Sequence, residues 1–266
     1  MYIEIHGARG SMPVGTAEFS TYGGDTTCYS LHHDDGTLIA IIDAGTGLRR
    51  ILPATMSAAE TSGRPVTIII THYHWDHIQG LSMCAPMWRG DVALRIIGPG
   101  DPRRCIGEAI SPPWFPASIT DMDVDFVPAV DSFVLDDVDV RSFPLHHPQG
   151  GRGYRFDHQD TSIVVATDHE AGTDADQVLV DASRGAGVLV HDTQYRPDEL
   201  ADKRGWGHST WEQAVEVAIA AEVDQLLFAS HDPSRTDAQV EEMVADAAER
   251  FGATTAARPG SRFWAK

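Results

Sequence analysis

Four side chains that can bind a metal ion occur close together, as His72, His74, Asp76 and His77. They follow an aliphatic run at 66–71 that is typical of a buried β-strand. Alternate residues of an extended segment point to the same side, so His72 and His74 can bind one ion. The adjacent Asp76 and His77 can turn toward a second ion. Because burying such groups is costly unless they coordinate something, the spacing predicts a metal site at the end of this strand.

Other short aliphatic runs end in polar or turn residues, a pattern typical of β-strands. We expect strands at 2–6, 28–32, 38–43, 66–71, 93–97, 138–143, 162–167 and 188–192. Helical spacing occurs at 47–52, 174–184, 210–222 and 237–251, with Thr210 and Asp237 as expected N-caps. Strand clusters with intervening helices favour an α/β (α+β) fold, a four-layer αββα sandwich. We expect residues 1–266 to form a single domain.

The composition indicates a folded protein that is poorly suited to long polyanions. Hydrophobic residues make up 42% of the 266 residues, enough for a sizeable core. The formal net charge of -19 repels extended nucleic acid, so we expect no long nucleic-acid partner. Cys28, Cys84 and Cys105 are far apart in sequence and predict free thiols rather than disulfides.

The sequence carries no signal for export or membrane insertion. Its start, Met-Tyr-Ile-Glu-Ile-His, has neither a basic segment nor a long apolar run. No later stretch approaches the roughly 18 apolar residues that a membrane helix requires. We therefore expect a soluble, cytoplasmic protein without a membrane partner.

The segment Thr-His-Tyr-His-Trp-Asp-His-Ile-Gln-Gly at 71–80 resembles the HxHxDH signature of the metallo-β-lactamase superfamily. Further family motifs follow in order at the ends of expected strands, so the resemblance runs essentially from Gly7 to His231. It implies an αββα sandwich with a dinuclear metal site at one edge.

The resemblance also implies the remaining ligands. The family pattern places a histidine directly before proline, which favours His147, before Pro148, over the neighbouring His146. An aspartate at the position of Asp43 orients a metal-bound histidine in the family. The implied assignment is His72, His74 and His147 on one ion, Asp76, His77 and His231 on the other, and Asp168 as the bridge.

This ligand set indicates two divalent ions. Nitrogen-rich ligation with carboxylates suits zinc best, with manganese or iron as alternatives. Two such ions would lower the pKa of a bridging water, and the resulting hydroxide is the expected nucleophile. Asp76 is expected to orient this water or accept its proton. True β-lactamases usually place a cysteine ligand near the position of Asp168, and its absence here argues against lactam hydrolysis.

Two further segments resemble the ribonuclease Z-like and small phosphodiesterase branch of the family. His-Asp-Thr-Gln-Tyr at 191–195 resembles the HEAT-type motif, with Asp192 where the ribonuclease carries Glu. Gly-His-Ser-Thr at 207–210 resembles its histidine loop. The resemblance implies that His208 lies beside the scissile phosphate, held and polarised by Asp192. Alternatively, His208 merely precedes the N-cap Thr210.

The expected function is hydrolysis of a small or cyclic, nucleotide-like phosphodiester, because the site favours an anion and the overall charge disfavours a long one. Ribonuclease Z grips transfer RNA with a protruding arm, and no basic, extended insertion is present here. One alternative is a carboxylic ester, lactone or thioester hydrolase that uses the same site. Another is a metal-binding sensor or partner protein. A homodimer is compatible with the resemblance.

Two features of the sequence each allow two interpretations. Arg9 could contact an anionic substrate or form an ordinary salt bridge. The proline-rich stretch 111–118 could cover the core or form a pocket wall.

Overall fold

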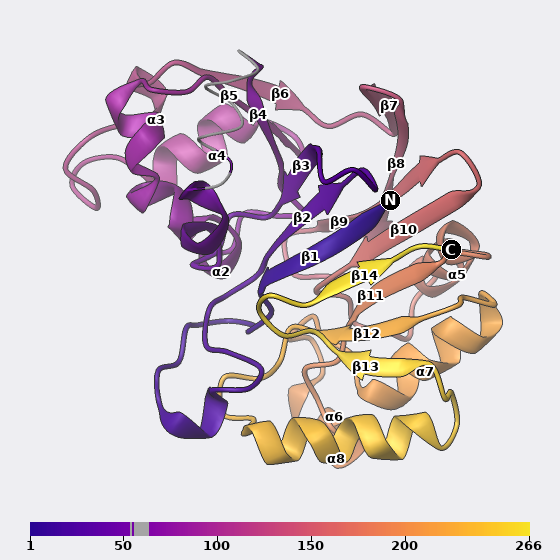
Figure 1. Cartoon of the computed structure of the whole chain (residues 1–266). Helices are drawn as coiled ribbons and strands as arrows, with labels where there is room; N and C mark the ends of the chain where they lie inside the picture. Colours follow the sequence, from indigo (N-terminus) through magenta and orange to yellow (C-terminus); the bar gives the residue numbers. More distant parts are fainter. Residues whose placement is uncertain (54, 56–63) are drawn as a thin grey trace.

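The computed structural model describes residues 1–53, 55 and 64–266 (Figure 1). In this part of the chain, two seven-stranded sheets pack face to face, and helices cover their outer faces. This arrangement confirms the αββα sandwich.

The first sheet has the order β14-β1-β2-β3-β4-β5-β6. Neighbouring strands are antiparallel from β14 to β3 and parallel from β3 to β6. Its strands are β1 (Tyr2–Gly7), β2 (Cys28–His32), β3 (Leu38–Ile42), β4 (Val66–Ile69), β5 (Leu94–Gly98), β6 (Val124–Pro128) and β14 (Arg262–Trp264).

The second sheet has the order β13-β12-β11-β10-β9-β8-β7. Its pairs are antiparallel from β7 to β10 and parallel from β10 to β13, so the carboxyl ends of β8, β10, β11 and β12 meet at one edge. Its strands are β7 (Ser132–Leu135), β8 (Val138–Leu145), β9 (Gly151–His158), β10 (Thr161–Ala166), β11 (Val188–Asp192), β12 (Leu226–Ala229) and β13 (Thr254–Ala256).

Apolar side chains fill the space between the sheets and beneath the helices. The central cluster joins strands of both sheets, for example Ile42 of β3 and Val165 of β10. A second cluster packs the first sheet against α2 (Trp75–Ile78), α3 (Ala85–Arg89) and α4 (Pro102–Ala109). A third packs the other sheet against α5 (Ala175–Ser183), α7 (Trp211–Ala220) and α8 (Asp237–Ala248). Short helical turns are η1 (Ala17–Phe19), η2 (Gln79–Met83), η3 (Ile119–Asp121), η4 (Pro197–Glu199) and α6 (Leu200–Lys203).

All eight expected strands are present, with ends that differ by up to two residues, and the four expected helices are present with ends that differ by up to three. The helix expected at 47–52 is seen as helical residues at 48–53. Thr210 caps α7, because its side chain accepts a hydrogen bond from the Gln213 backbone N–H. The expected N-cap Asp237 is wrong. Thr236 caps α8, and the Asp237 carboxylate instead accepts hydrogen bonds from the backbone of Thr21 and Tyr22.

Candidate metal centre

Three polar residues that follow strands at one edge of the sandwich have an uncommon backbone conformation. Asp43 after β3, Asp168 after β10 and Ser230 after β12 have φ values of 57°, 59° and 54°. Left-handed conformations cost non-glycine residues of order 1–3 kcal/mol and cluster at functional sites. Two more residues of this kind, Ser11 and Gln149, also contact the candidate site. At this edge of the sandwich, the backbone therefore adopts strained conformations that place these side chains.

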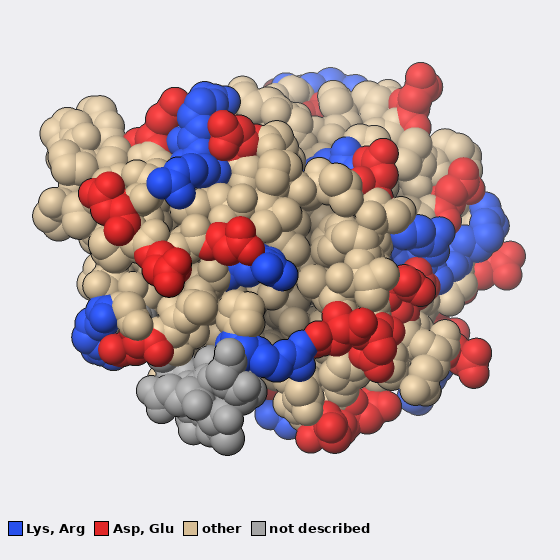
Figure 2. All heavy atoms as spheres, turned by 90° about the horizontal axis from the view of Figure 1, so that it is seen from above, with Lys and Arg blue, Asp and Glu red and all other residues tan. Residues whose placement is uncertain are grey.

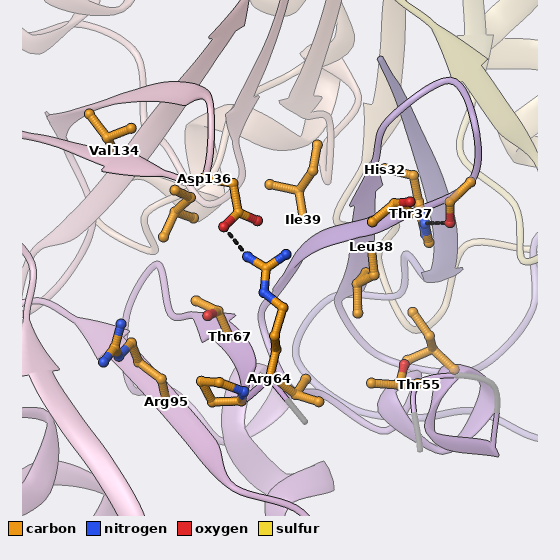
Figure 3. A pocket seen from close by; sticks show the side chains of 15 residues that line it. His32, Thr37, Leu38, Ile39, Thr55, Arg64, Thr67, Arg95, Val134 and Asp136 are labelled. Carbon is orange, nitrogen blue, oxygen red and sulfur yellow. Dashed lines mark hydrogen bonds and ion pairs between the residues drawn. The ribbon is translucent and has the colours of Figure 1, made fainter. Parts of the chain in front are cut away.

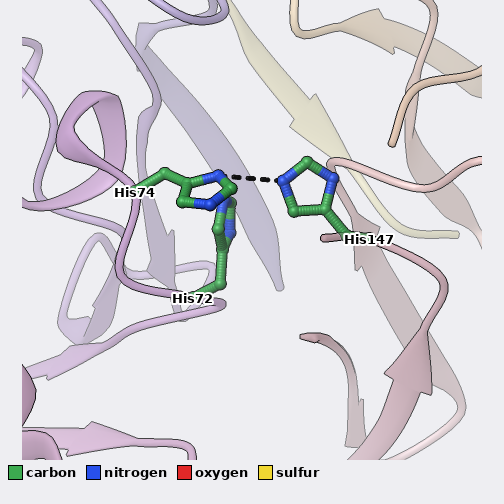
Figure 4. Close-up of side chains that lie close together, drawn as sticks. All are labelled: His72, His74 and His147. Carbon is green, nitrogen blue, oxygen red and sulfur yellow. Dashed lines mark hydrogen bonds between the residues drawn. The ribbon is translucent and has the colours of Figure 1, made fainter. Parts of the chain in front are cut away.

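Three histidines from two sheets converge at this edge (Figure 4). The rings of His72 and His74 are 4.6 Å apart, and His147, which follows β8, lies 4.6 Å from the first and 4.8 Å from the second. His147 Nε2 is 3.0 Å from His74 Nδ1. Three imidazole nitrogens facing one another are a typical ligand set for a transition metal.

Asp168 joins this group to a second one. Its Oδ2 lies 3.5 Å from His72 Nε2, 3.2 Å from His77 Nε2 and 3.8 Å from His147 Nε2. Asp76 Oδ2 lies 3.3 Å from the same His77 nitrogen. Asp168, which the resemblance implied as the bridge, thus lies close to histidines of both groups.

Two of the inward nitrogens support binding of a cation. His72 Nε2 and His77 Nε2 are buried and have no hydrogen-bond partner. A buried polar atom without a partner costs about 1–3 kcal/mol, and a cation would satisfy both nitrogens. The donor set of imidazoles and carboxylates therefore fits divalent metal ions.

The opposite nitrogen of each ring is held by another group. His77 Nδ1 contacts Asp43 Oδ2 at 2.8 Å, and His147 Nδ1 contacts the Gly207 carbonyl at 2.8 Å. His74 Nε2 contacts Gln149 Oε1 at 2.9 Å. Such contacts fix the ring orientation and leave the other nitrogen available for coordination. Gln149, which a turn after His147 places here, was not among the residues predicted from the sequence.

His208 lies beside the cluster and is oriented by Asp192. His208 Nδ1 contacts Asp192 Oδ2 at 2.7 Å, and the His208 ring lies 5.3 Å from that of His147. The Asp192 carboxylate also accepts backbone hydrogen bonds from His169 and Gln194. These contacts bring together the two residues that the sequence predicted to act on the substrate.

Charges within the site change the protonation of its histidines. Burial disfavours the charged form of His208, but Asp192 and Asp168 outweigh it and raise its pKa to about 9. Burial lowers the pKa of His72 well below its ordinary value. A neutral His72 is the form that coordinates a metal.

His231, expected as the seventh ligand, has its Nε2 bound elsewhere. Its Nε2 contacts the Ala257 carbonyl at 3.0 Å, and its ring packs edge-on against Tyr22. The preceding residue, Ser230, points inward instead, and its hydroxyl donates to Asp168 Oδ1 at 2.9 Å. Ser230 follows β12 in a left-handed conformation, and its hydroxyl contacts Asp168 whereas His231 Nε2 contacts Ala257.

Three other expectations can be compared with the structure. His146 is exposed and contacts the Glu170 carbonyl, so only His147 faces the cluster. Arg9 is fully buried and donates to the carbonyls of Gly23, Asp232 and Arg235, which is neither of the expected roles. In the stretch 111–118, the Phe115 ring packs 5.1 Å from that of Trp88, as expected for a cover over the core.

A cavity of about 500 Å³ lies away from these residues (Figure 3). Its lining includes Leu38, Ile39 and Val66, together with an Arg64–Asp136 ion pair. None of the clustered histidines and aspartates lines it. The candidate metal site is therefore at the edge with the histidines and not in this cavity.

Fold and site together define a metal-dependent hydrolase of the αββα class. The family model described as "Beta-lactamase superfamily domain" matches residues 40–231, and the chain belongs to this family.

Curated relatives and solved structures agree with this placement. The chain is 28% identical over 246 residues to ribonuclease Z of Mycobacterium avium (strain 104), covering 81% of this chain and 84% of the relative. The metallo-β-lactamase fold protein YhfI from Bacillus subtilis has a TM-score of 0.78 at 15% identity, covering 100% of this chain and 98% of the other. A diphosphatase from the PhnP family has a TM-score of 0.69 at 20% identity, covering 99% and 97%.

Among the described residues, no helix combines the length and the apolar character needed to cross a membrane.

Proposed function

We propose that this protein is a phosphodiesterase that cleaves small or cyclic, nucleotide-like phosphodiesters with two divalent cations, zinc in the first instance. His72, His74, His147 and Asp168 would hold one cation, and Asp76, His77 and Asp168 the other. Bound cations would lower the pKa of a coordinated water and offset negative charge on a phosphate.

The observation that carries the proposal is the His208–Asp192 pair beside the cluster. His147, Asp168 and His208 present ligand atoms within 4.8 Å of one another. Because Asp192 holds Nδ1, the other ring nitrogen of His208 is available to a substrate oxygen. From there it can donate a proton to a phosphate oxygen or to the leaving group. Acyl hydrolysis would be favoured by a His208 that faced away from the cluster, which is not its orientation.

Exposed tryptophans near the ligands support a substrate with a flat ring. Trp75 lies between two ligand residues in the chain and has 55% of its surface exposed. Trp206, two residues before His208, is 60% exposed and has the Lys203 ammonium 4.5 Å from its ring centre. The Glu170 carboxylate accepts the backbone N–H groups of Gly205 and Gly207 and so fixes this loop. Fixed, exposed tryptophans can stack on nucleobases.

The overall charge supports a small anion rather than a long one, because a net charge of -19 repels a polyanion. On the face seen in Figure 2, Lys and Arg side chains occur in small groups beside Asp and Glu, without a continuous basic band. A long nucleic acid is normally held by many phosphate contacts to basic residues. We therefore propose a small anionic substrate as the partner and leave the homodimer as a prediction.

A comparison of turnover among substrates tests this function. The purified protein, supplied with zinc or manganese, is assayed on bis(p-nitrophenyl) phosphate, cyclic nucleotides, p-nitrophenyl acetate and a lactone. We expect turnover of the phosphodiesters to exceed acyl turnover. Acyl cleavage without phosphodiester cleavage would select the carboxylic ester, lactone or thioester hydrolase, and no turnover in a fully metallated sample would select the sensor.

A further inference from the structure

A separate group of side chains that can bind a metal ion lies at the opposite end of the sandwich from the candidate metal centre. It consists of His33, Asp137 and His158, whose ligand atoms all lie within 4.8 Å of one another. Asp137 directly precedes β8, and His147 of the metal centre follows the other end of that strand. The 8 residues of β8, at about 3.3 Å each, separate the two groups by roughly 26 Å. A cation bound here would therefore not touch the histidine edge.

The three residues come from three turns and from both sheets. His33 follows β2 of the first sheet, and its backbone N–H donates to the Thr37 carbonyl at 2.9 Å. Asp137 belongs to the two-residue hairpin that joins β7 to β8 in the second sheet. His158 ends β9, directly before another two-residue hairpin. Because such short hairpins have a fixed register, the backbone holds the ligands in place before any ion binds.

The Asp137 carboxylate stands between the two imidazoles. Its Oδ1 lies 3.3 Å from His33 Nε2, and its Oδ2 lies 3.1 Å from His158 Nε2. The two rings are 5.0 Å apart and meet edge to face. Ligand atoms at about 2.0–2.2 Å from a tetrahedral zinc ion are about 3.3–3.6 Å apart from one another. The observed separations are therefore close to those in a zinc site.

Burial and charge suit a cation that enters from solvent. The side chains of His33 and His158 are 19% and 15% exposed, whereas that of Asp137 is 65% exposed. Among the described residues, Asp137 forms ion pairs with these two imidazoles and not with Lys or Arg. An imidazole carries a full positive charge only when it is protonated, so the carboxylate has no permanent cation beside it. A divalent ion would supply that charge.

We propose that His33, Asp137 and His158 form a further cation site, which binds zinc at micromolar free concentration and joins the two sheets at this end. Two imidazoles and one carboxylate suit zinc, with water completing the coordination. Because the cation binds the folded arrangement and not the unfolded chain, it stabilises the sandwich and takes no part in hydrolysis. The proposal does not depend on the phosphodiesterase activity proposed above.

Zinc content per chain tests the site. The unaltered protein, Asp137→Asn, His158→Gln and His32→Gln are stripped with a chelator, equilibrated with zinc buffered at micromolar free concentration, and measured by elemental analysis. His32→Gln is the matched control, because His32 directly precedes His33 but its Nε2 contacts Ser30 Oγ at 2.7 Å. We expect Asp137→Asn and His158→Gln to bind one equivalent fewer than the unaltered protein and the control. This difference does not depend on how many cations the histidine edge holds.

Thermal unfolding of the same samples tests the structural role. With zinc at about 100 times the dissociation constant of the site, the zinc-induced rise in melting temperature should be roughly 5–10 °C smaller in Asp137→Asn than in the control. Equal zinc content in all four proteins would overturn the site and leave two ordinary His–Asp hydrogen bonds. An equal rise in melting temperature would overturn its structural role. Asp137→Asn and His158→Gln each decide the matter alone if the other does not fold.

Discussion

His77 and Asp43 form a fully buried pair in which Nδ1 of the imidazole donates to Oδ2 of the carboxylate over 2.8 Å. The same carboxylate accepts hydrogen bonds from the backbone and the hydroxyl of Thr71. Asp43 therefore sets the direction of His77 and anchors the end of β4 at the same time. The opposite nitrogen, His77 Nε2, is left facing Asp76 and Asp168.

Asp43→Ala should weaken metal binding, although Asp43 is not one of the expected ligands. Partners of this kind typically contribute about 10–100-fold to metal affinity. Competition with a chromophoric chelator measures the effect, and Asp139→Ala, which removes an exposed carboxylate on β8, is the control. An unchanged affinity in Asp43→Ala would show that His77 does not need this partner.

His208→Ala and His74→Ala should differ in metal content. The first removes a group that acts on the substrate, so phosphodiester turnover should fall about 10²–10⁴-fold with the metal retained. The second removes a ligand, so metal and turnover should fall together. Elemental analysis alongside kinetics makes the comparison, and equal metal loss in both variants would contradict the separate roles.

Trp206→Ala should weaken binding of cyclic nucleotides. Stacking on an aromatic side chain contributes about 1–3 kcal/mol per base, so KM should rise by roughly tenfold with little change in kcat. Trp114→Ala removes another exposed tryptophan, on the 111–118 stretch, and is the matched control. The stacking role fails if both variants show the same KM.

His6 should make the fold sensitive to acid. Burial is the main cause that lowers its pKa to about 4, and the charges of His32, Arg50 and Arg262 add to it. The unfolded chain binds this proton near pH 6.5, so the contribution of neutral His6 is complete above that pH and is lost as the pH falls toward 4. Between pH 7 and 5 the loss is about 2 kcal/mol.

Urea unfolding at pH 7 and pH 5 measures this effect. His6→Gln cannot titrate, although it can still contact Ser30, the partner of His6 Nε2 at 2.7 Å. Its free energy of unfolding should therefore fall less between the two pH values than that of the unaltered protein. Parallel losses in both proteins would exclude His6 as the source.

The sequence predicted the strands whose apolar residues form continuous runs. The segment 66–71 is of this kind, and it places the first histidines correctly because the ligands follow directly. The sequence missed β9, where Gly151, Arg152, Gly153 and Arg155 interrupt the pattern, and whose pairing depends on β8 and β10 on either side. The short edge strands β13 and β14 have too few residues for a pattern.

For the site, sequence order predicted the cluster but not the direction of every side chain. His72, His74, Asp76, His77, His147 and Asp168 come together because each follows a strand that ends at the same edge. The choice between Ser230 and His231 depends on a left-handed backbone turn at Ser230, which residue types alone do not reveal.

The central claim is that the histidine and aspartate cluster holds the divalent cations on which phosphodiester hydrolysis depends. The most direct measurement is metal content per chain before and after chelation, with turnover of bis(p-nitrophenyl) phosphate on the same samples. We expect activity to disappear with the metal and to return when zinc or manganese is restored. Full turnover by the metal-free protein would contradict the claim.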